Sequence, residues 1–480
     1  MSDAGGRALI RFGTDGWRAR IAEDFTFANL ERVAQAYADY LRQSSEATGT
    51  RLVVVGYDRR FLSERFALRA SEVLAGNGFS VRLFNEAVPT PLVSWAVREQ
   101  RAAGGVVITA SHNPPDFNGF KIKADFGGSA PPEITASVEA LLDTQPPRRA
   151  ALLQDDEADH QQALEASVSS YRAQVAAYVD LERVGQAAMR VVIDPMHGSG
   201  GRWVESFLRR GPLEAETIRA ERDALFGGTS PEPIDRNLGP LRARVLERRA
   251  HLGLATDGDA DRVGAVNELG ETMTMHEVVP LLLLHLARGR GLRGGVIRTF
   301  SQSILTKRIA AAHNLKLYET PIGFKYIADL MLREEILIGA EESGGIGVRG
   351  HIPERDGILN SLLLLEAVVM AGKPPSLMVR EMHREFGEFY FGRRDLHMDV
   401  ARGMEMVAML AANAPQSVAG YRVSGVETLD GTKLLFDDES WLLFRQSGTE
   451  PVLRVYSEAT SKAKTHALLD EGTRLALAEL

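Results

Sequence analysis

Residues 104–123 read GGVVITASHNPPDFNGFKIK, and this stretch decides which fold we predict. Its apolar run at 106–108 predicts a buried strand. Prolines at 114 and 115 stop that strand, because proline excludes helix and pushes the preceding residue toward extended geometry. Ser111 is therefore expected at the carboxyl end of a strand, where ligands bind in open α/β sheets. A plain turn is the alternative, since Ser and Asn favour turns for backbone reasons alone.

Strand and helix patterns alternate on both sides of this stretch. Three times a buried strand ends in a polar loop: at Ser111, at Asp257 and at Glu341. The pattern predicts an α/β protein with three related α/β domains, each a mixed sheet between helices, and a smaller α+β domain with hairpin signals. The expected domains are 1–145, 166–270, 271–380 and 385–480, with 145–166 as a surface connection and boundary.

Composition narrows the function classes. The 480 residues carry a formal net charge of −8, which argues against general nucleic-acid binding. The chain has no cysteine, which excludes disulfides, thiolate catalysis and Cys-ligated zinc. The first residues lack the apolar core of a signal peptide, and the longest apolar runs are too short to span a bilayer. We therefore expect a soluble cytoplasmic protein without membrane or nucleic-acid partners.

Asp257, Asp259 and Asp261 alternate along one loop, so their carboxylates repel one another unless a cation neutralises them. Oxygen ligands without His or Cys indicate Mg²⁺, with Ca²⁺ or Mn²⁺ as alternatives. A calcium loop is one alternative, because Glu268 falls at its twelfth position, but Arg262 stands where that loop needs glycine. A solvated acidic turn is another.

Two further polar segments indicate a phosphorylated, hydroxylated ligand. The run RQSGTEP at 445–451, with Arg454 on the next predicted strand, offers guanidinium and hydroxyl groups to a phosphate, although it could be an ordinary polar turn. Residues 323–325 and 341–343 suit a sugar, although surface ion pairs look the same in sequence. Together with Ser111 and the predicted magnesium loop, these segments favour phosphoryl transfer through a phosphoserine.

The chain resembles the α-D-phosphohexomutase family, nearest to phosphoglucomutases and phosphomannomutases. Matching motifs stand in the expected order over nearly the full length: FGTDGWR, TASHNPPDFNGFKI, DGDADR, GFKYI, EESGG and RQSGTEP. The resemblance implies a heart-shaped molecule in which three α/β domains and a TATA-binding-protein-like domain surround a central cleft. It also implies hexose phosphate substrates, Mg²⁺, and glucose 1,6-bisphosphate as intermediate and activator.

The resemblance also implies residue roles. Ser111 would be phosphorylated in the resting enzyme and would bind Mg²⁺ with the three aspartates. Lys121 would be a general acid/base. For that role its pKa must be lowered, by burial close to cations. The remaining implied residues are Arg18 and His112 on the phosphate side, Arg262, Gly323, Lys325, Glu341 and Ser343 toward the sugar, and Arg445, Ser447, Gly448, Thr449 and Arg454 around the non-reacting phosphate.

One position departs from the bacterial bifunctional mutases. They carry a histidine where this chain has Gly345, so His351 either supplies the second acid/base or is a structural histidine that caps a loop. The EESGG and HIPERDG runs resemble the phosphoglucomutase branch, which favours glucose phosphates. Phosphomannomutase, dual-specificity and phosphoglucosamine mutase activities are alternatives. A magnesium-dependent phosphomonoesterase and a metal-dependent binding protein are further alternatives, and a monomer or a homodimer is expected.

Overall fold

A computed structural model describes residues 9–13, 16–152, 157–208, 211–447 and 451–478. The chain packs as two compact units, each assembled from separate stretches of sequence. The N-terminal unit consists of Met1–Met273, Phe324–Glu334 and Ser343–Pro375; the C-terminal unit consists of Thr274–Gly323, Glu335–Glu342 and Ser376–Leu480. The predicted heart shape concerns the placement of these units and stays a prediction.

The first sheet of the N-terminal unit carries the Ser111 loop. Its strands, in spatial order, are β1 (Trp17–Arg20), β5 (Phe117–Lys123), β4 (Gly104–Ile108), β2 (Leu52–Tyr57) and β3 (Ser80–Leu83). Strands β4, β2 and β3 are parallel, whereas β5 is antiparallel to both of its neighbours. The helices of this module are α1 (Phe27–Thr48), α2 (Ser63–Gly76), α3 (Thr90–Glu99) and α4 (Pro132–Ala140). The expected strand before Ser111 is therefore a buried central strand.

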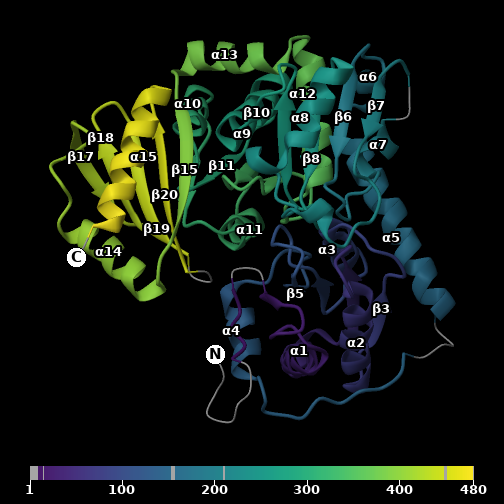
Figure 1. The fold of residues 1–480 in the computed structure, drawn as a ribbon. Coiled ribbons are helices and arrows are strands. Elements are labelled where there is room, and N and C mark those ends of the chain that lie inside the picture. The colour runs from purple at the N-terminus through teal and green to yellow at the C-terminus, as the bar shows by residue number, and fades with distance from the viewer. Residues whose placement is uncertain (1–8, 14–15, 153–156, 209–210, 448–450, 479–480) are drawn as a thin grey trace. The chain divides into compact units, whose positions relative to one another are not determined.

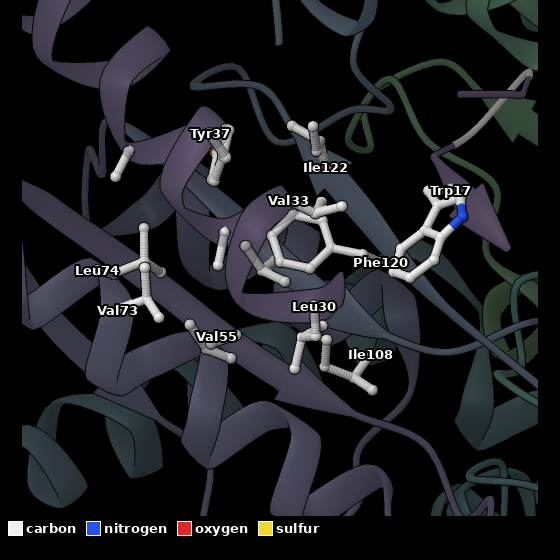
Figure 2. Packing of buried hydrophobic residues seen from close by; sticks show 14 of the residues in the cluster. Trp17, Leu30, Val33, Tyr37, Val55, Val73, Leu74, Ile108, Phe120 and Ile122 are labelled. Atoms are coloured by element: carbon white, nitrogen blue, oxygen red, sulfur yellow. The ribbon is translucent and has the colours of Figure 1, made fainter. Parts of the chain in front are cut away.

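Helix α1 packs on this sheet through the stripe that its apolar spacing predicts. Leu30, Val33 and Tyr37 recur three to four positions apart and are fully buried. They belong to one cluster with Val55 and Ile108 of the sheet, as Figure 2 shows. The helix runs from Phe27 to Thr48.

The second sheet repeats this plan. Its strands, in spatial order, are β10 (Thr272–Met273), β9 (Val263–Asn267), β8 (Leu252–Thr256), β6 (Arg190–Asp194) and β7 (Glu214–Thr217). Again three parallel strands are followed by one antiparallel strand, β9, and by an antiparallel edge strand. Short 3₁₀ turns η2 (Phe226–Gly228) and η3 (Asp235–Asn237) accompany helices α6 (Leu181–Gly185), α7 (Trp203–Phe207) and α8 (Gly239–Arg248).

Helix α5 (Glu157–Tyr178) corrects one prediction. Residues 145–166 were expected to form a surface connection, but the helix begins inside that range. Its buried side chains Leu164, Tyr171 and Val175 form a narrow stripe, and Trp95 of α3 donates from Nε1 to Ser170 Oγ at 2.7 Å. The acidic run and prolines before this stripe favoured a loop, whereas packing against α3 stabilises the helix.

The third set of parallel strands keeps the same order in the C-terminal unit. Strand β11 (Gly295–Thr299) lies between β12 (Leu317–Thr320) and β13 (Ile336–Ala340), all parallel. Helix α9 (Met275–Leu284), the π-helical turn η4 (His285–Gly289) and α10 (Ile304–Ala312) belong to this module. The shared strand order agrees with the prediction of related α/β modules.

Three elements from the same part of the sequence belong to the N-terminal unit: α11 (Phe324–Arg333), β14 (Ile346–Val348) and α12 (Gly357–Ala371). Helix α12 is apolar on all sides and largely buried. Asp356 caps its first turn by accepting from the backbone N–H groups of Ile358 and Leu359. Gly372, at φ 61°, ends it in the left-handed conformation that glycine adopts readily.

The C-terminal sheet is antiparallel throughout (Figure 1). Its spatial order is β15 (Tyr390–His397), β20 (Val452–Ala459), β19 (Trp441–Gln446), β18 (Thr432–Phe436), β17 (Tyr421–Glu427) and β16 (Ser417–Val418). The unit also contains α13 (Pro375–Phe386), α14 (Val400–Ala412) and α15 (Lys462–Leu477). Helices α14 and α15 share an apolar cluster with one face of this sheet, which includes Leu442 and Phe444. The α+β prediction is confirmed.

No single helix in the described ranges is long and apolar enough to cross a membrane. Helices α12 and α13, which are joined at a sharp bend, have the length and apolar composition of a membrane span only when they are taken together. Most of α12 is buried inside the protein.

Candidate active site

The loop between β4 and β5 holds Ser111 in a buried and strained conformation. Its φ is 52°, in the left-handed region that few residues other than glycine occupy, and it is 1% exposed. Ser111 Oγ donates to Asp257 Oδ2 at 2.7 Å and lies 3.4 Å from His112 Nδ1. The hydroxyl predicted to carry a phosphoryl group therefore contacts the first predicted metal ligand.

Asp257, Asp259 and Asp261 lie on the tight turn that joins the antiparallel strands β8 and β9. All three are fully buried, and they offer carboxylate oxygens within 4.8 Å of one another. Asp259 Oδ1 and Asp261 Oδ1 accept no hydrogen bond from any residue that the structure describes. Converging carboxylates with such oxygens fit a hard divalent cation such as Mg²⁺. The strands on both sides exclude the helix-flanked calcium loop.

Lys121, on β5, and Arg355 bring positive charge to this turn. Lys121 Nζ lies 2.7 Å from Asp259 Oδ2 and 2.8 Å from Asp261 Oδ2. Arg355 Nη2 lies 3.0 Å from Asp261 Oδ2. Thr90, at the start of α3, donates from Oγ1 to Asp259 Oδ2 at 2.7 Å. Neither Thr90 nor Arg355 was predicted from the sequence, because a threonine between prolines and an arginine beside a glutamate are ordinary surface patterns.

The surroundings shift the pKa values of Asp257 and Asp259 in opposite directions. Burial, and then the charges of Asp259 and Asp261, raise the pKa of Asp257 well above its ordinary value. Burial also acts to raise the pKa of Asp259, but the Lys121 ammonium outweighs it and holds that pKa below its ordinary value. A divalent cation would favour ionised Asp257, so metal binding and proton release are linked at this turn.

Two more predicted residues lie beside these loops. Arg18, on β1, donates from Nη1 to Asn113 Oδ1 at 2.9 Å, which attaches it to the Ser111 loop. Ser343 precedes Gly344, whose carbonyl accepts from the N–H of Val263 at 3.1 Å at the start of β9. A Cβ on Gly344 would lie 2.5 Å from the Val263 carbonyl oxygen, so this approach requires glycine. Ser343 is thereby held near the aspartate turn.

His351 lies in an aromatic cluster. Its ring stacks on Trp95 with centroids 5.7 Å apart, and its Nε2 is 2.9 Å from Asp356 Oδ2. Tyr171 donates from its hydroxyl to the same oxygen at 2.8 Å. These contacts with the helix-capping aspartate favour the structural alternative for His351. Lys325, on α11, lies 5.1 Å from the ring centroid of its neighbour Tyr326.

The C-terminal unit gathers the predicted phosphate-binding residues. Arg445 and Arg454 are directly opposed on the neighbouring strands β19 and β20. Arg445 Nε lies 2.9 Å from Asp430 Oδ2, which also accepts from the N–H of Ile322, just before Gly323. Of four other predicted residues, Glu341 is buried directly after β13 and Ser447 directly follows β19, whereas Gly448 and Thr449 lie outside the described residues.

Four family models match the chain in sequence order. They are described as phosphoglucomutase/phosphomannomutase alpha/beta/alpha domain I over residues 9–149, domain II over 169–270, domain III over 275–386, and the C-terminal domain over 398–474. The four-domain α/β fold predicted from the sequence is thereby confirmed.

Individual proteins match over almost their whole length. The phosphoglucomutase/phosphomannomutase of Thermococcus kodakarensis is 31% identical over 464 residues, which cover 97% of this chain and 98% of the relative. The phosphoglucosamine mutase of Carboxydothermus hydrogenoformans is 28% identical, covering 96% and 97%. A crystal structure from Thermus thermophilus, provisionally assigned as a phosphomannomutase, matches with a TM-score of 0.84 and 38% identity, covering 98% of this chain and 100% of that one. The chain belongs to the α-D-phosphohexomutase family.

Proposed function

We propose that the chain interconverts α-D-glucose 1-phosphate and glucose 6-phosphate through a phosphorylated Ser111 and a glucose 1,6-bisphosphate intermediate. The observation that carries this proposal is the 2.7 Å contact of Ser111 Oγ with Asp257, inside a buried cluster of carboxylates and cations. Such a position suits phosphoryl transfer, because its catalysis depends mainly on positioning and on charge stabilisation.

The proposed step exchanges one phosphorus–oxygen bond for another. The bond from phosphorus to Ser111 Oγ breaks as a bond forms to the free sugar hydroxyl. Lys121 accepts the hydroxyl proton and then donates it to Ser111 Oγ, which leaves as the serine hydroxyl, so that Lys121 returns to its starting state. Mg²⁺ held by Asp257, Asp259 and Asp261 would stabilise the negative charge of the transferring group. The bisphosphate then turns over and returns its other phosphate to Ser111 by the reverse step.

Lys121 can accept a proton only if its ammonium is destabilised. Its two carboxylate partners at 2.7 and 2.8 Å favour the charged form. A cation that neutralises those carboxylates would lower the pKa of this buried lysine, which suits a general acid/base. We assign Arg18 and His112 to the phosphate side of the site, from their places beside the Ser111 loop.

The other proposed contacts orient the sugar phosphate. Arg445 and Arg454, with Ser447, Gly448 and Thr449, would hold the non-reacting phosphate, since paired guanidinium groups bind phosphate oxygens strongly. Glu341 and Ser343 would contact sugar hydroxyls, with Arg262, Gly323 and Lys325 around them. A second phosphate site favours a mutase over a phosphomonoesterase, because a phosphomonoesterase gains little from binding a second phosphate group.

The test is a coupled assay with glucose 1-phosphate, Mg²⁺ and glucose 1,6-bisphosphate. We expect glucose 6-phosphate without net release of inorganic phosphate. Steady phosphate release in place of isomerisation would refute the mutase and favour the phosphomonoesterase. Ser111→Ala should abolish turnover, whereas a protein that only binds metal and ligand would keep its function.

Phosphoglucosamine mutase is the second candidate, since a relative of that name matches over nearly the whole chain. Phosphomannomutase or dual activity is a third, from the name of the Thermococcus relative. Mannose and glucosamine phosphates should be run in parallel. Faster turnover of either would replace glucose as the assigned substrate. The cytoplasmic location and the oligomeric state stay predictions.

A further inference from the structure

Arg60 lies in the loop between β2 and α2, and its side chain is fully buried. We propose that Arg60 is the positioning residue that fixes the Ser111 loop for phosphoryl transfer. The proposal rests on the proposed function of Ser111. It adds a residue that has no described hydrogen bond or ion pair with Asp257, Asp259 or Asp261 and that, being fully buried, does not contact a substrate.

All five N–H groups of the Arg60 guanidinium have acceptors. Nη2 donates to the carbonyl oxygens of Ser111 and Asn113, both at 2.7 Å. Nη1 donates to those of Pro114 at 2.7 Å and Phe117 at 3.0 Å. Nε donates to Asp58 Oδ2 at 3.1 Å. One planar group therefore ties down four carbonyls of the loop, and a lysine, with three donors and no plane, cannot replace it.

The backbone N–H of Ser111 is linked to the ion pair of Arg60 with Asp58 through one intervening side chain. The N–H of Ser111 donates to Thr109 Oγ1 at 2.8 Å, and that hydroxyl donates to Asp58 Oδ2 at 2.6 Å. Asp58 Oδ1 accepts from the Arg60 N–H at 3.0 Å and from Ser63 Oγ at 2.9 Å. Both backbone polar groups of Ser111 are thus anchored to the Asp58–Arg60 pair.

This anchoring explains how Ser111 keeps a left-handed conformation. A non-glycine residue at φ 52° persists only where its surroundings over-determine it. The prolines that follow supply no N–H groups, so the loop has few hydrogen bonds of its own. A buried ion pair is weak evidence for stability, whereas fixing one geometry is a role in which buried charges are retained. The Arg60 network therefore points to positioning.

The first test compares Arg60→Lys with Arg219→Lys in the mutase assay. Arg219 is a matched control, because its guanidinium also pairs with a buried carboxylate, that of Asp194, with Nε at 2.9 Å from Oδ1. For folded Arg60→Lys we expect kcat to fall about 100-fold with KM within about threefold, since a small misplacement of a reacting group has that effect. Arg219→Lys should lower the melting temperature without this fall in kcat. Unchanged kcat in folded Arg60→Lys would overturn the proposal.

Thr109→Val tests the same frame without removing a charge, in case Arg60→Lys does not fold. It removes the hydroxyl between Ser111 N–H and Asp58 and should lower kcat about tenfold. Hydrogen exchange, followed by mass spectrometry, supplies a readout that needs no activity: both variants should lose amide protection in residues 109–117 selectively. A wild-type protein without mutase activity would refute the proposed function alone. Unchanged protection of this loop in the variants would overturn the role of Arg60.

Discussion

Replacing Lys121 by methionine should tighten Mg²⁺ binding while abolishing mutase activity. In the metal-free site the Lys121 ammonium is the counter-ion of Asp259 and Asp261, at 2.7 and 2.8 Å. Removing one partner of a buried ion pair costs about 3–5 kcal/mol. Arg355 remains on Asp261 in the variant, so we take the lower end, about 3 kcal/mol. Metal binding recovers this energy, because the cation replaces the lost charge.

An energy of about 3 kcal/mol corresponds to roughly 100-fold in affinity, and protons taken up by the unpaired carboxylates reduce the gain. We expect Mg²⁺ to bind Lys121→Met about 10- to 100-fold more tightly than wild type, measured by isothermal titration calorimetry at pH 8 on chelator-treated protein. Thermal denaturation should show a lower melting temperature without metal and a larger shift with it.

Lys123→Met is the matched control for Lys121→Met. Lys123 lies two residues along the same strand, is equally buried, and pairs with Glu354 at 2.5 Å and with none of the three aspartates by any described contact. Its replacement should destabilise the protein without changing Mg²⁺ affinity. Equal affinity in Lys121→Met and wild type would refute the counter-ion argument, and so would an equal gain in Lys123→Met.

Three further predictions concern single side chains. Ser111→Ala should keep the melting temperature near that of wild type. Intact-mass analysis of this variant should find no phosphate added by glucose 1,6-bisphosphate. A phosphate found on the variant would show that another residue is phosphorylated. Glu458→Gln should destabilise the C-terminal unit by roughly 3 kcal/mol in urea denaturation. One oxygen of the buried carboxylate accepts from His276 and Ser303, the other from the N–H of Ile304 and from Trp441, and the NH₂ group that replaces either oxygen loses its two bonds and faces two donors. A loss below about 1 kcal/mol would contradict this prediction. Burial lowers the pKa of Lys433 to about 8. The unfolded chain therefore binds more protons between pH 8 and its ordinary pKa of 10.5, so wild-type stability should rise with pH in that window, by up to about 3 kcal/mol, relative to Lys433→Met. Parallel stability curves would refute this linkage.

The sequence predicted the features that local patterns control. Apolar strands that stop at polar loops placed Ser111 and the aspartate turn at strand ends, where the structure brings them together. The spacing of three carboxylates needs no distant contact to indicate a cation. The first part of helix α5 was missed, because its buried stripe is narrow and stabilises the helix only through packing against α3.

Long-range partners were beyond the sequence patterns. Arg60, Thr90 and Arg355 each reach a loop that lies far away in the chain, and nothing in their local sequence marks that contact. An arginine beside an acidic residue is usually a solvated ion pair. Only burial distinguishes Arg60 and Arg355 from such pairs, and burial is set by the packing of the sheets.

The charges at the aspartate turn explain why one site would use a metal and a phosphoserine together. Three buried carboxylates face three cations: Lys121, Arg355 and, 3.9 Å from Asp261, Arg262. With Asp257 ionised, as a bound cation favours, these six charges balance formally, and Mg²⁺ alone would leave an excess of two positive charges. A phosphate ester on Ser111 carries about −1.5 to −2 at neutral pH, which offsets that excess. Since buried charge is unfavourable unless paired, metal and phosphoryl group each favour the binding of the other. This mutual dependence suits an enzyme that must keep its phosphoryl group until a sugar phosphate arrives.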